Sequence, residues 1–382
     1  PLYSSAASDV YKRQILCTVI LIVVMEALFA LIGALMPGPF TGTVTDAETN
    51  EPIANVSVSD GRNVVKTDEN GAYTLPGYSK SRFVTVTTPA GYWTENYYIP
   101  VTKDRETYDF RLDKSEKTAQ ADHSFLQISD SEIGAKGVGA WIEHVRDTVK
   151  ETDPAFLIHT GDICYEDGLK QHIKDMNTEN MGVPVRYVIG NHDYVAGKYG
   201  EALFESIYGP VWYSFDVGNV HYVVTPFQTG ADYASGYNKN DRWKWLENDL
   251  ANVEPGMKVV MFNHTKAPSD DYVLSYGLKK LDLKEHDLIA WVYGHYHYNY
   301  ITETDGVLNI STGRPDCGGI DSSASGSRLI SITANGQVST QMYYYDFEQP
   351  QAPDGANWSA QLEGNLLFAD PLAVGNQIFA AT

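Results

Sequence analysis

Five short apolar runs in the middle of the chain each end abruptly in a cluster of polar residues. They lie between His123 and Phe347, and the clusters read SDSE, HTGD, GNHD, NH and GHYH. Amphipathic helical patterns, such as GAWIEHVRDTVKET and DRWKWLENDLANV, separate the runs. The alternation predicts an α/β fold, in which the carboxyl ends of the strands meet at one edge and form a site there.

The polar clusters supply the side chains of a metal centre. Six candidate ligands would meet at this edge: Asp130, Asp162, Asn191, His264, His295 and His297. Imidazole suits Zn, Fe, Mn or Ni, whereas carboxylate and amide oxygens suit harder ions. Two such ions, about 3.5–4 Å apart and bridged by a carboxylate, clamp the attacking and leaving oxygens of a phosphoryl displacement. Asp162 is the candidate bridge, and we expect a metal-bound hydroxide to attack phosphorus in line.

The motifs GD, GNHD, a lone strand-end histidine and GHYH occur in the order and spacing of calcineurin-like metallophosphoesterases, which this region resembles. The resemblance covers residues 121–346 and extends to VWYSFDVGNVHYVVT and WLENDL, which match the central strand pair and a helix of that family. It implies an αββα sandwich that hydrolyses phosphate monoesters or diesters with two divalent metal ions, and it leaves the metals open among Mn, Fe, Zn and Ni.

The resemblance also implies a role for each matching residue. It assigns Asp130 and His297 to the first metal, Asn191, His264 and His295 to the second, and Asp162 to the bridge between them. His192 would hydrogen-bond to a phosphate oxygen and protonate the leaving alkoxide. Asp193 would orient His192 and raise its basicity.

The first motif departs from the family pattern, because the usual D-x-H is here Asp130-Ser131-Glu132. Glu132 could bind the first metal through oxygen, or a water could take its place. Tyr165 is a second candidate, since purple acid phosphatases of the same superfamily place a tyrosine ligand to ferric iron there. Their first motif is D-x-G, which this chain lacks. An oxygen ligand in place of histidine favours a harder first metal, such as Mn, Fe or Mg.

A strand-rich region, residues 38–113, precedes these motifs. Apolar and polar residues alternate between Asp, Asn and Gly turns, which predicts a small antiparallel β-sandwich. Residues 67–71 (TDENG) read as a turn, or alternatively as an acidic calcium loop. The region resembles the carboxypeptidase-regulatory-like, prealbumin-type domain of exported bacterial proteins, which implies a non-catalytic accessory module. The charged stretch from Arg105 to His123 is interpreted as a linker.

Both ends of the chain carry segments of a different kind. Residues 1–14 resemble translated adapter sequence and are interpreted as a non-native tail. Residues 15–37 contain an apolar run that predicts a signal peptide or membrane anchor, although Glu26 disfavours a stable span. Residues 349–382 resemble the opening of a quinoprotein-type β-propeller repeat, which predicts a partial β domain at the C-terminus.

The net charge of the chain limits which binding partners are expected. The formal net charge is -21 and the sequence pI is about 4.8, with no basic run beyond Lys12 and Arg13, so binding to nucleic-acid duplexes is not expected. We expect an exported bacterial protein (periplasmic, cell-envelope or extracellular) that acts on a phosphorylated small molecule or lipid. The alternative is a non-catalytic cell-envelope binding protein on the same scaffold.

Overall fold

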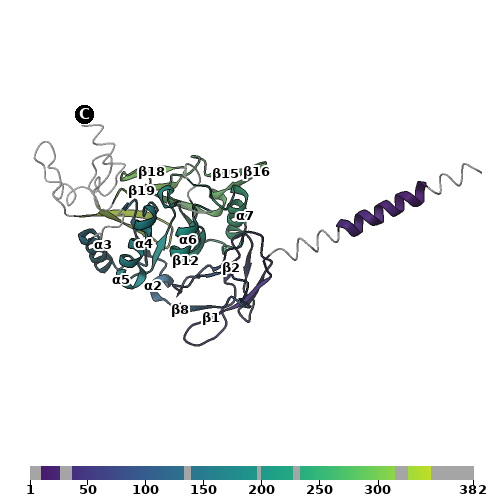
Figure 1. Cartoon of the computed structure of the whole chain (residues 1–382). Helices are drawn as coiled ribbons and strands as arrows, with labels where there is room; N and C mark the ends of the chain where they lie inside the picture. The colour runs from purple at the N-terminus through teal and green to yellow at the C-terminus, as the bar shows by residue number, and fades with distance from the viewer. Residues whose placement is uncertain are drawn as a thin grey trace, which may run out of the picture.

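The structure, a computed structural model, describes residues 10–25, 37–132, 139–195, 199–226, 233–314 and 326–345. Two sandwiches follow one another along the chain (Figure 1). The predicted C-terminal β domain, residues 349–382, lies outside the described residues.

Residues 10–25 form a helix whose side chains are exposed. The helix crosses the boundary that the sequence placed between a tail ending at residue 14 and an apolar segment beginning at residue 15. Among the residues that the structure describes, no helix is both long and apolar enough to cross a membrane.

The N-terminal sandwich consists of two four-stranded sheets. The first has the order β4-β1-β8-β6, with β1 (Phe40–Asp46), β4 (Ala72–Leu75), β6 (Tyr92–Trp93) and β8 (Phe110–Lys114). The second has the order β3-β2-β5-β7, with β2 (Ser57–Ser59), β3 (Val64–Lys66), β5 (Phe83–Val86) and β7 (Tyr98–Pro100). This arrangement confirms the small all-β sandwich. The expectation that it is wholly antiparallel was wrong, because β1 and β8 pair in parallel. The segment before β4 is a turn, in which Asp68 Oδ1 accepts hydrogen bonds from the amides of Asn70 and Ala72, both at 2.9 Å.

The predicted linker between the two sandwiches is instead part of the fold. Strand β8 lies between β1 and β6, and the short helix α2 (Glu116–Ala119) follows it, capped by the Ser115 side chain. The interpretation as a linker was wrong because the charged residues of β8 alternate with apolar ones. Phe110 and Leu112 are buried in the sandwich, whereas Arg111 and Asp113 face solvent.

The larger sandwich has two mixed sheets. The first has the order β11-β10-β9-β20-β21, with β9 (His123–Ile128), β10 (Phe156–His159), β11 (Val185–Tyr187), β20 (Gly326–Ile332) and β21 (Val338–Tyr344). The second has the order β12-β13-β14-β17-β19-β18, with β12 (Tyr213–Val217), β13 (Val220–Val224), β14 (Lys258–Phe262), β17 (Leu288–Tyr293), β18 (Tyr300–Thr304) and β19 (Val307–Ser311). A separate hairpin pairs β15 (Val273–Tyr276) with β16 (Lys279–Asp282).

Helices cover the outer faces of these sheets (Figure 1). They are α3 (Gly139–Thr152), α4 (Tyr165–Asp175), α5 (Thr178–Met181), α6 (Ala202–Tyr208) and α7 (Lys239–Leu250), with two short 3₁₀ turns, η1 (Asn191–Asp193) and η2 (Leu283–His286). Strand residues alternate between two buried layers. Phe125 and Phe156 stack between the sheets, whereas Leu126 and Leu157 pack toward the helices. Burial on both faces explains the continuous apolar runs and confirms the αββα sandwich.

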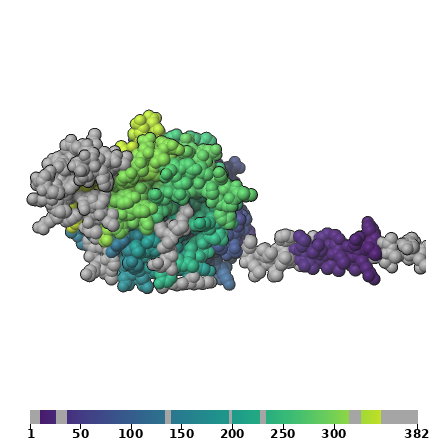
Figure 2. Space-filling model, turned by 90° about the horizontal axis from the view of Figure 1, so that it is seen from above, coloured from purple at the N-terminus to yellow at the C-terminus, as the bar shows by residue number. Residues whose placement is uncertain are grey.

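The N-terminal sandwich packs directly on the larger one. Arg186 of β11 is 1% exposed, and its guanidinium lies 4.0 Å from the ring centroid of Trp93 and 4.2 Å from that of Tyr97. A backbone bridge joins Thr88 to Phe215 of β12. The dark blue surface of the N-terminal sandwich accordingly adjoins the teal and green surface of the larger one (Figure 2). Strand β11 leads into the GNHD segment, so the N-terminal sandwich supports a strand that carries site residues.

A buried histidine ties α7 to the second sheet. His221 of β13 places Nδ1 2.7 Å from Asp216 Oδ1 and Nε2 3.0 Å from Asp249 Oδ2 on α7. Burial lowers the pKa of His221, but the two carboxylates outweigh burial and raise it to about 10. Because this folded-state pKa lies above the unfolded value, the stabilisation is complete below about pH 6.5 and is lost as the pH rises toward 10.

We therefore expect His221→Gln to lower the free energy of unfolding by about 3 kcal/mol at pH 6, because it leaves two carboxylates without their cation. Urea unfolding of both proteins from pH 6 to pH 10 should show this difference shrinking as the pH rises. The partly exposed His286 provides a control, and His286→Gln should have little effect. A difference that stays constant across this range would contradict the assignment.

Candidate metal centre

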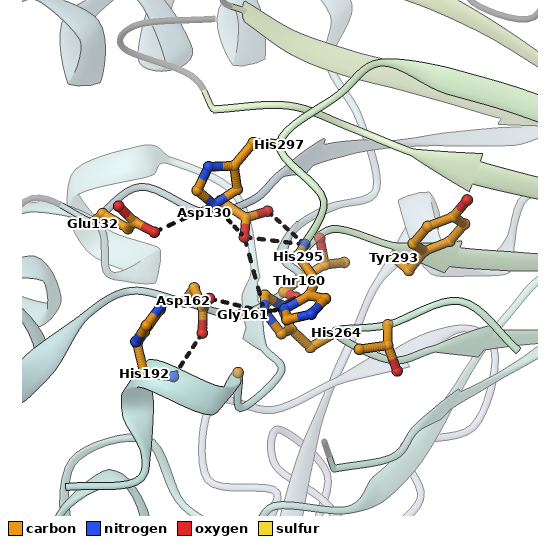
Figure 3. A network of polar contacts seen from close by, with 12 residues as sticks. Asp130, Glu132, Thr160, Gly161, Asp162, His192, His264, Tyr293, His295 and His297 are labelled. Atoms are coloured by element: carbon orange, nitrogen blue, oxygen red, sulfur yellow. Dashed lines mark hydrogen bonds and ion pairs between the residues drawn. The ribbon is translucent and has the colours of Figure 1, made fainter. Parts of the chain in front are cut away.

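The predicted site residues meet at one edge of the larger sandwich, where strands of both sheets end (Figure 3). Asp130 follows β9, Asp162 follows β10, and Asn191 lies in η1 just beyond β11. From the second sheet, His264 follows β14 and His295 follows β17. The structure brings the side chains of Asp130, Asp162, His264 and His295 close together at this edge.

The backbone at this edge adopts conformations that non-glycine residues rarely take. Positive φ angles occur at Asp130 (53°), Glu132 (45°), Asp162 (54°), His295 (70°) and His297 (51°). Each such residue costs on the order of 1–3 kcal/mol, and clusters of them mark sites where the surrounding fold enforces a functional geometry. Four of the five are predicted metal ligands. The fifth, Glu132, stands in the sequence where the family usually has a histidine ligand.

Glycines in the motifs allow neighbouring loops to approach closely. A Cβ on Gly190 would lie 2.1 Å from Asp162 Oδ1, and one on Gly294 would lie 1.8 Å from Ser129 Oγ. Both distances are shorter than any van der Waals contact. The glycines of GNHD and GHYH are therefore needed so that the loops can pack around the carboxylates.

Asp162 lies at the centre of the cluster and is 1% exposed. Its Oδ1 accepts a hydrogen bond from the backbone amide of His192 at 2.9 Å. Its Oδ2 lies 3.0 Å from His264 Nε2 and 3.9 Å from His192 Nε2. One oxygen is thus fixed by the backbone, while the other faces the imidazoles of His264 and His192.

Two groups of candidate ligand atoms share Asp162. Atoms of Asp162, His264 and His295 lie within 4.8 Å of one another, and so do atoms of Glu132, Asp162 and His192. His264 Nδ1 lies 2.8 Å from the Thr160 carbonyl oxygen and donates to it, which directs Nε2 into the cluster. His295 Nδ1 lies 3.3 Å from that Nε2.

Asn191 fits a metal ligand for a separate reason. Its Oδ1 is buried and has no hydrogen-bond partner among the residues described here. A buried amide oxygen without a partner is costly, and a metal ion would satisfy it. Asp130 is fully buried, and both of its oxygens accept the His295 amide, at 3.0 and 2.9 Å.

Glu132 points toward the ligands that were predicted for the first metal. Its Oε1 lies 3.3 Å from His297 Nε2, which is itself 3.4 Å from Asp130 Oδ1. The hydrogen bond to His297 lowers the pKa of Glu132, and the hydrogen bonds to Asp130 and Glu132 raise the pKa of His297 to about 10. Glu132 therefore lies beside His297, and His297 in turn lies beside Asp130, the other residue predicted to bind the first metal.

His192 lies at the outer side of the cluster, with 34% of its side chain exposed. The Tyr165 ring packs against it, with the two ring centroids 5.2 Å apart. Tyr165 begins α4, has a positive φ of 51° and is 58% exposed. The structure thus places Tyr165 beside the His192 imidazole at the solvent-facing side of the site.

Asp193 differs from the expectation that it contacts His192. Its carboxylate is fully buried and accepts hydrogen bonds from the amides of Gly190 (2.8 Å), Asp162 (3.0 Å) and Cys164 (2.9 Å). Within the described part of the chain, no hydrogen bond joins this carboxylate to the His192 ring. The 3₁₀ turn of η1 directs the Asp193 side chain inward, so its role is to hold the GD and GNHD loops together.

Sequence reasoning missed two contributors to the site, Thr160 and Arg314, and suggested only a supporting position for a third, His159. His159 Nε2 lies 2.8 Å from Ser131 Oγ and supports the loop that carries Asp130 and Glu132. The Thr160 carbonyl orients His264. Arg314 donates to Glu132 Oε2 at 2.9 Å. A sixth strand end could have pointed to Arg314, because β19 also ends at this edge. The residues at this strand end, STGR, include no typical metal ligand.

Two family models match parts of this chain. Residues 123–299 match the family model for calcineurin-like phosphoesterase, and residues 38–115 match the model for the N-terminal domain of calcineurin-like phosphoesterase. A search of curated proteins finds no match.

The chain is also similar to several solved structures, all at low sequence identity. The anchor of the inner membrane complex of Plasmodium is 13% identical, with 66% of this chain and 96% of that chain covered and a TM-score of 0.40. Phosphopantetheinyl hydrolase from Mycobacterium tuberculosis is 17% identical, with 51% of this chain and 91% of that chain covered and a TM-score of 0.33. A putative 5'-nucleotidase from Staphylococcus aureus, in complex with α-ketoglutarate, is 14% identical, with 64% of this chain and 58% of that chain covered and a TM-score of 0.35.

An αββα sandwich with clustered carboxylates and imidazoles at its strand ends, together with the match to the phosphoesterase family model, supports the general class of metal-dependent phosphoester hydrolases. More specifically, the chain carries a calcineurin-like phosphoesterase domain preceded by the N-terminal domain of that family. The family is dependent on a dinuclear metal centre, and the residues at this site fit one.

We expect divalent metal ions to stabilise the protein, because they bind this cluster only in the folded state. At a metal concentration 100-fold above Kd the gain is about 2.7 kcal/mol. His264 and His297, with pKa values of about 9 and 10, hold protons that the metal must displace, so the stabilisation should grow as the pH rises from 6 to 8. Thermal unfolding with Mn²⁺ and with chelator measures the effect.

A matched pair of asparagine variants provides the control. Asn191→Ala removes the amide oxygen without a partner and should reduce the metal-induced shift. Asn252→Ala, at the end of α7, should leave it unchanged. An equal shift in both variants would exclude Asn191 as a ligand.

Proposed function

We propose that this protein hydrolyses phosphate esters, monoesters or diesters, with two divalent metal ions held at the strand-end cluster. The observation that carries the proposal is the sharing of Asp162 by two groups of ligand atoms, with His192 at the exposed side. Asp130, Glu132, Asp162 and His297 would hold the first ion, and Asp162, Asn191, His264 and His295 the second. When bound, the ions supply Lewis acidity and lower the pKa of water for attack on phosphorus.

His192 is the proposed acid for the leaving group. Its backbone amide is fixed by Asp162 Oδ1, and its ring lies beside the Tyr165 ring with a third of its surface open to solvent. A substrate phosphate at the metals would therefore meet the imidazole on its solvent side, where the leaving alkoxide departs. Asp193 would act only indirectly, by holding the loop that carries His192.

The proposed substrate is a phosphorylated small molecule or lipid. A net charge of -21 disfavours polyanionic nucleic acids, so the metals have to provide the local attraction for a phosphate. The exposed Tyr165 ring beside His192 offers an apolar surface for a leaving group.

Purified protein loaded with Mn²⁺, Zn²⁺, Fe²⁺ or Ni²⁺ should hydrolyse p-nitrophenyl phosphate or its bis ester. His192→Ala should retain both metals but lose about 10²–10⁴-fold in kcat, because it removes general acid catalysis. His286→Ala is the control, since η2 precedes β17 and lies at the end of that strand opposite to the site. Folded protein that binds two metals but turns over neither ester would favour the non-catalytic binding function instead.

We also propose that the apolar segment, residues 15–37, directs export and anchors or releases the protein outside the cytoplasm. The support is its composition and the exposed apolar side chains of the helix over residues 10–25. In a bacterial host, the full chain should fractionate with the membrane or periplasm, whereas a chain starting at residue 38 should stay in the cytosol. Recovery of both from the cytosol would contradict export.

A further inference from the structure

The Glu132 carboxylate is held from two sides at the metal centre. Its Oε1 faces His297 Nε2 at 3.3 Å, and its Oε2 accepts a hydrogen bond from Arg314 Nη1 at 2.9 Å. The backbone amide of Glu132 also donates to the Asp162 carbonyl oxygen at 3.2 Å. The side chains of Glu132 and Arg314 are each 22% exposed, so both are partly shielded from solvent.

The segment that carries Arg314 is itself well fixed. The Thr312 hydroxyl donates to Gln127 Oε1 at 2.7 Å, which connects this segment to β9 of the other sheet. The Gly313 amide donates to Asn299 Oδ1 at 2.9 Å. Arg314 therefore follows two residues that are hydrogen-bonded to other parts of the site, and its guanidinium can orient a carboxylate.

Arg314 also compensates the negative charge that Glu132 adds to the site. A glutamate in place of the usual histidine adds a negative charge beside the buried carboxylates of Asp130 and Asp162. Like charges in a shielded site repel strongly. Arg314 is always protonated and compensates this charge without occupying the oxygen that faces His297.

We propose that Arg314 is a positioning residue that anchors Glu132 as an oxygen ligand of the first metal, and that this position consequently selects Mn²⁺ or Fe²⁺ over Zn²⁺. The inference rests on the metal centre of the proposed function. It concerns metal binding, however, and can be tested without turnover. Oxygen ligands favour harder ions, whereas a histidine at the same position would favour Zn²⁺.

The test is a double-mutant cycle with four proteins: wild type, Arg314→Gln, Glu132→His and the double variant. Titration calorimetry with Mn²⁺ and Zn²⁺, together with elemental analysis, gives the affinity and stoichiometry of each site. Arg314→Gln should weaken Mn²⁺ binding at one of the two sites by about 10–100-fold, the usual effect of losing a group that orients a ligand. Glu132→His should raise the ratio of Zn²⁺ to Mn²⁺ affinity.

The coupling between the two residues distinguishes positioning from a general structural effect. In the Glu132→His background, Arg314→Gln should change metal affinity by no more than about 3-fold, because the carboxylate that it anchors is gone. Arg314→Lys keeps the charge but loses the planar fork, and it should fall between wild type and Arg314→Gln. It also keeps the test decisive if Arg314→Gln fails to fold.

Two outcomes would overturn the inference. One is Mn²⁺ binding at both sites with wild-type affinity in Arg314→Gln and Arg314→Lys, and the other is an equal loss in both Glu132 backgrounds. Failure of the proposed function looks different. Wild-type protein would then bind two metals, and show the coupling, without hydrolysing either ester.

Discussion

The buried carboxylate of Asp193 is the contact on which the geometry of the site depends. It accepts three backbone amides, and these belong to the two loops that follow β10 and β11. Because the loops are joined in this way, Asp162 can reach the His192 amide and the His264 ring at the same time. Asp193 is fully buried, and this burial raises its pKa to about 7. Burying this carboxylate costs free energy, but the single Asp193 side chain holds two loops in place.

The strands and the six principal candidate ligands could be predicted because apolar runs end where polar side chains begin. A strand buried on both faces has a continuous apolar sequence, and its end is therefore visible without a structure. The direction of a side chain beyond that end is not visible. Asp193 follows His192 directly in sequence, yet the 3₁₀ turn directs it away from that ring and toward the backbone.

Two other differences have equally local causes. Strand β8 was interpreted as linker because its charged residues dominate the sequence, although they occupy only the solvent-facing positions. Arg314 was overlooked because a strand end without histidine or carboxylate does not suggest a metal ligand. Its importance comes from Glu132, which lies 182 positions earlier in the chain. Pairings over such a separation are set by topology, here by β19 ending at the same edge as β9.

The charge of the site explains how an acidic protein could receive an anionic substrate. Without metals, the carboxylates of Asp130, Glu132 and Asp162 are balanced by protons on His264 and His297 and by Arg314. With metals bound, the imidazoles become neutral ligands, and two divalent ions exceed the three carboxylates by one positive charge. Arg314 adds one further positive charge beside the ions. Under the proposed function, Arg314 would offset the negative charge that Glu132 adds in place of histidine.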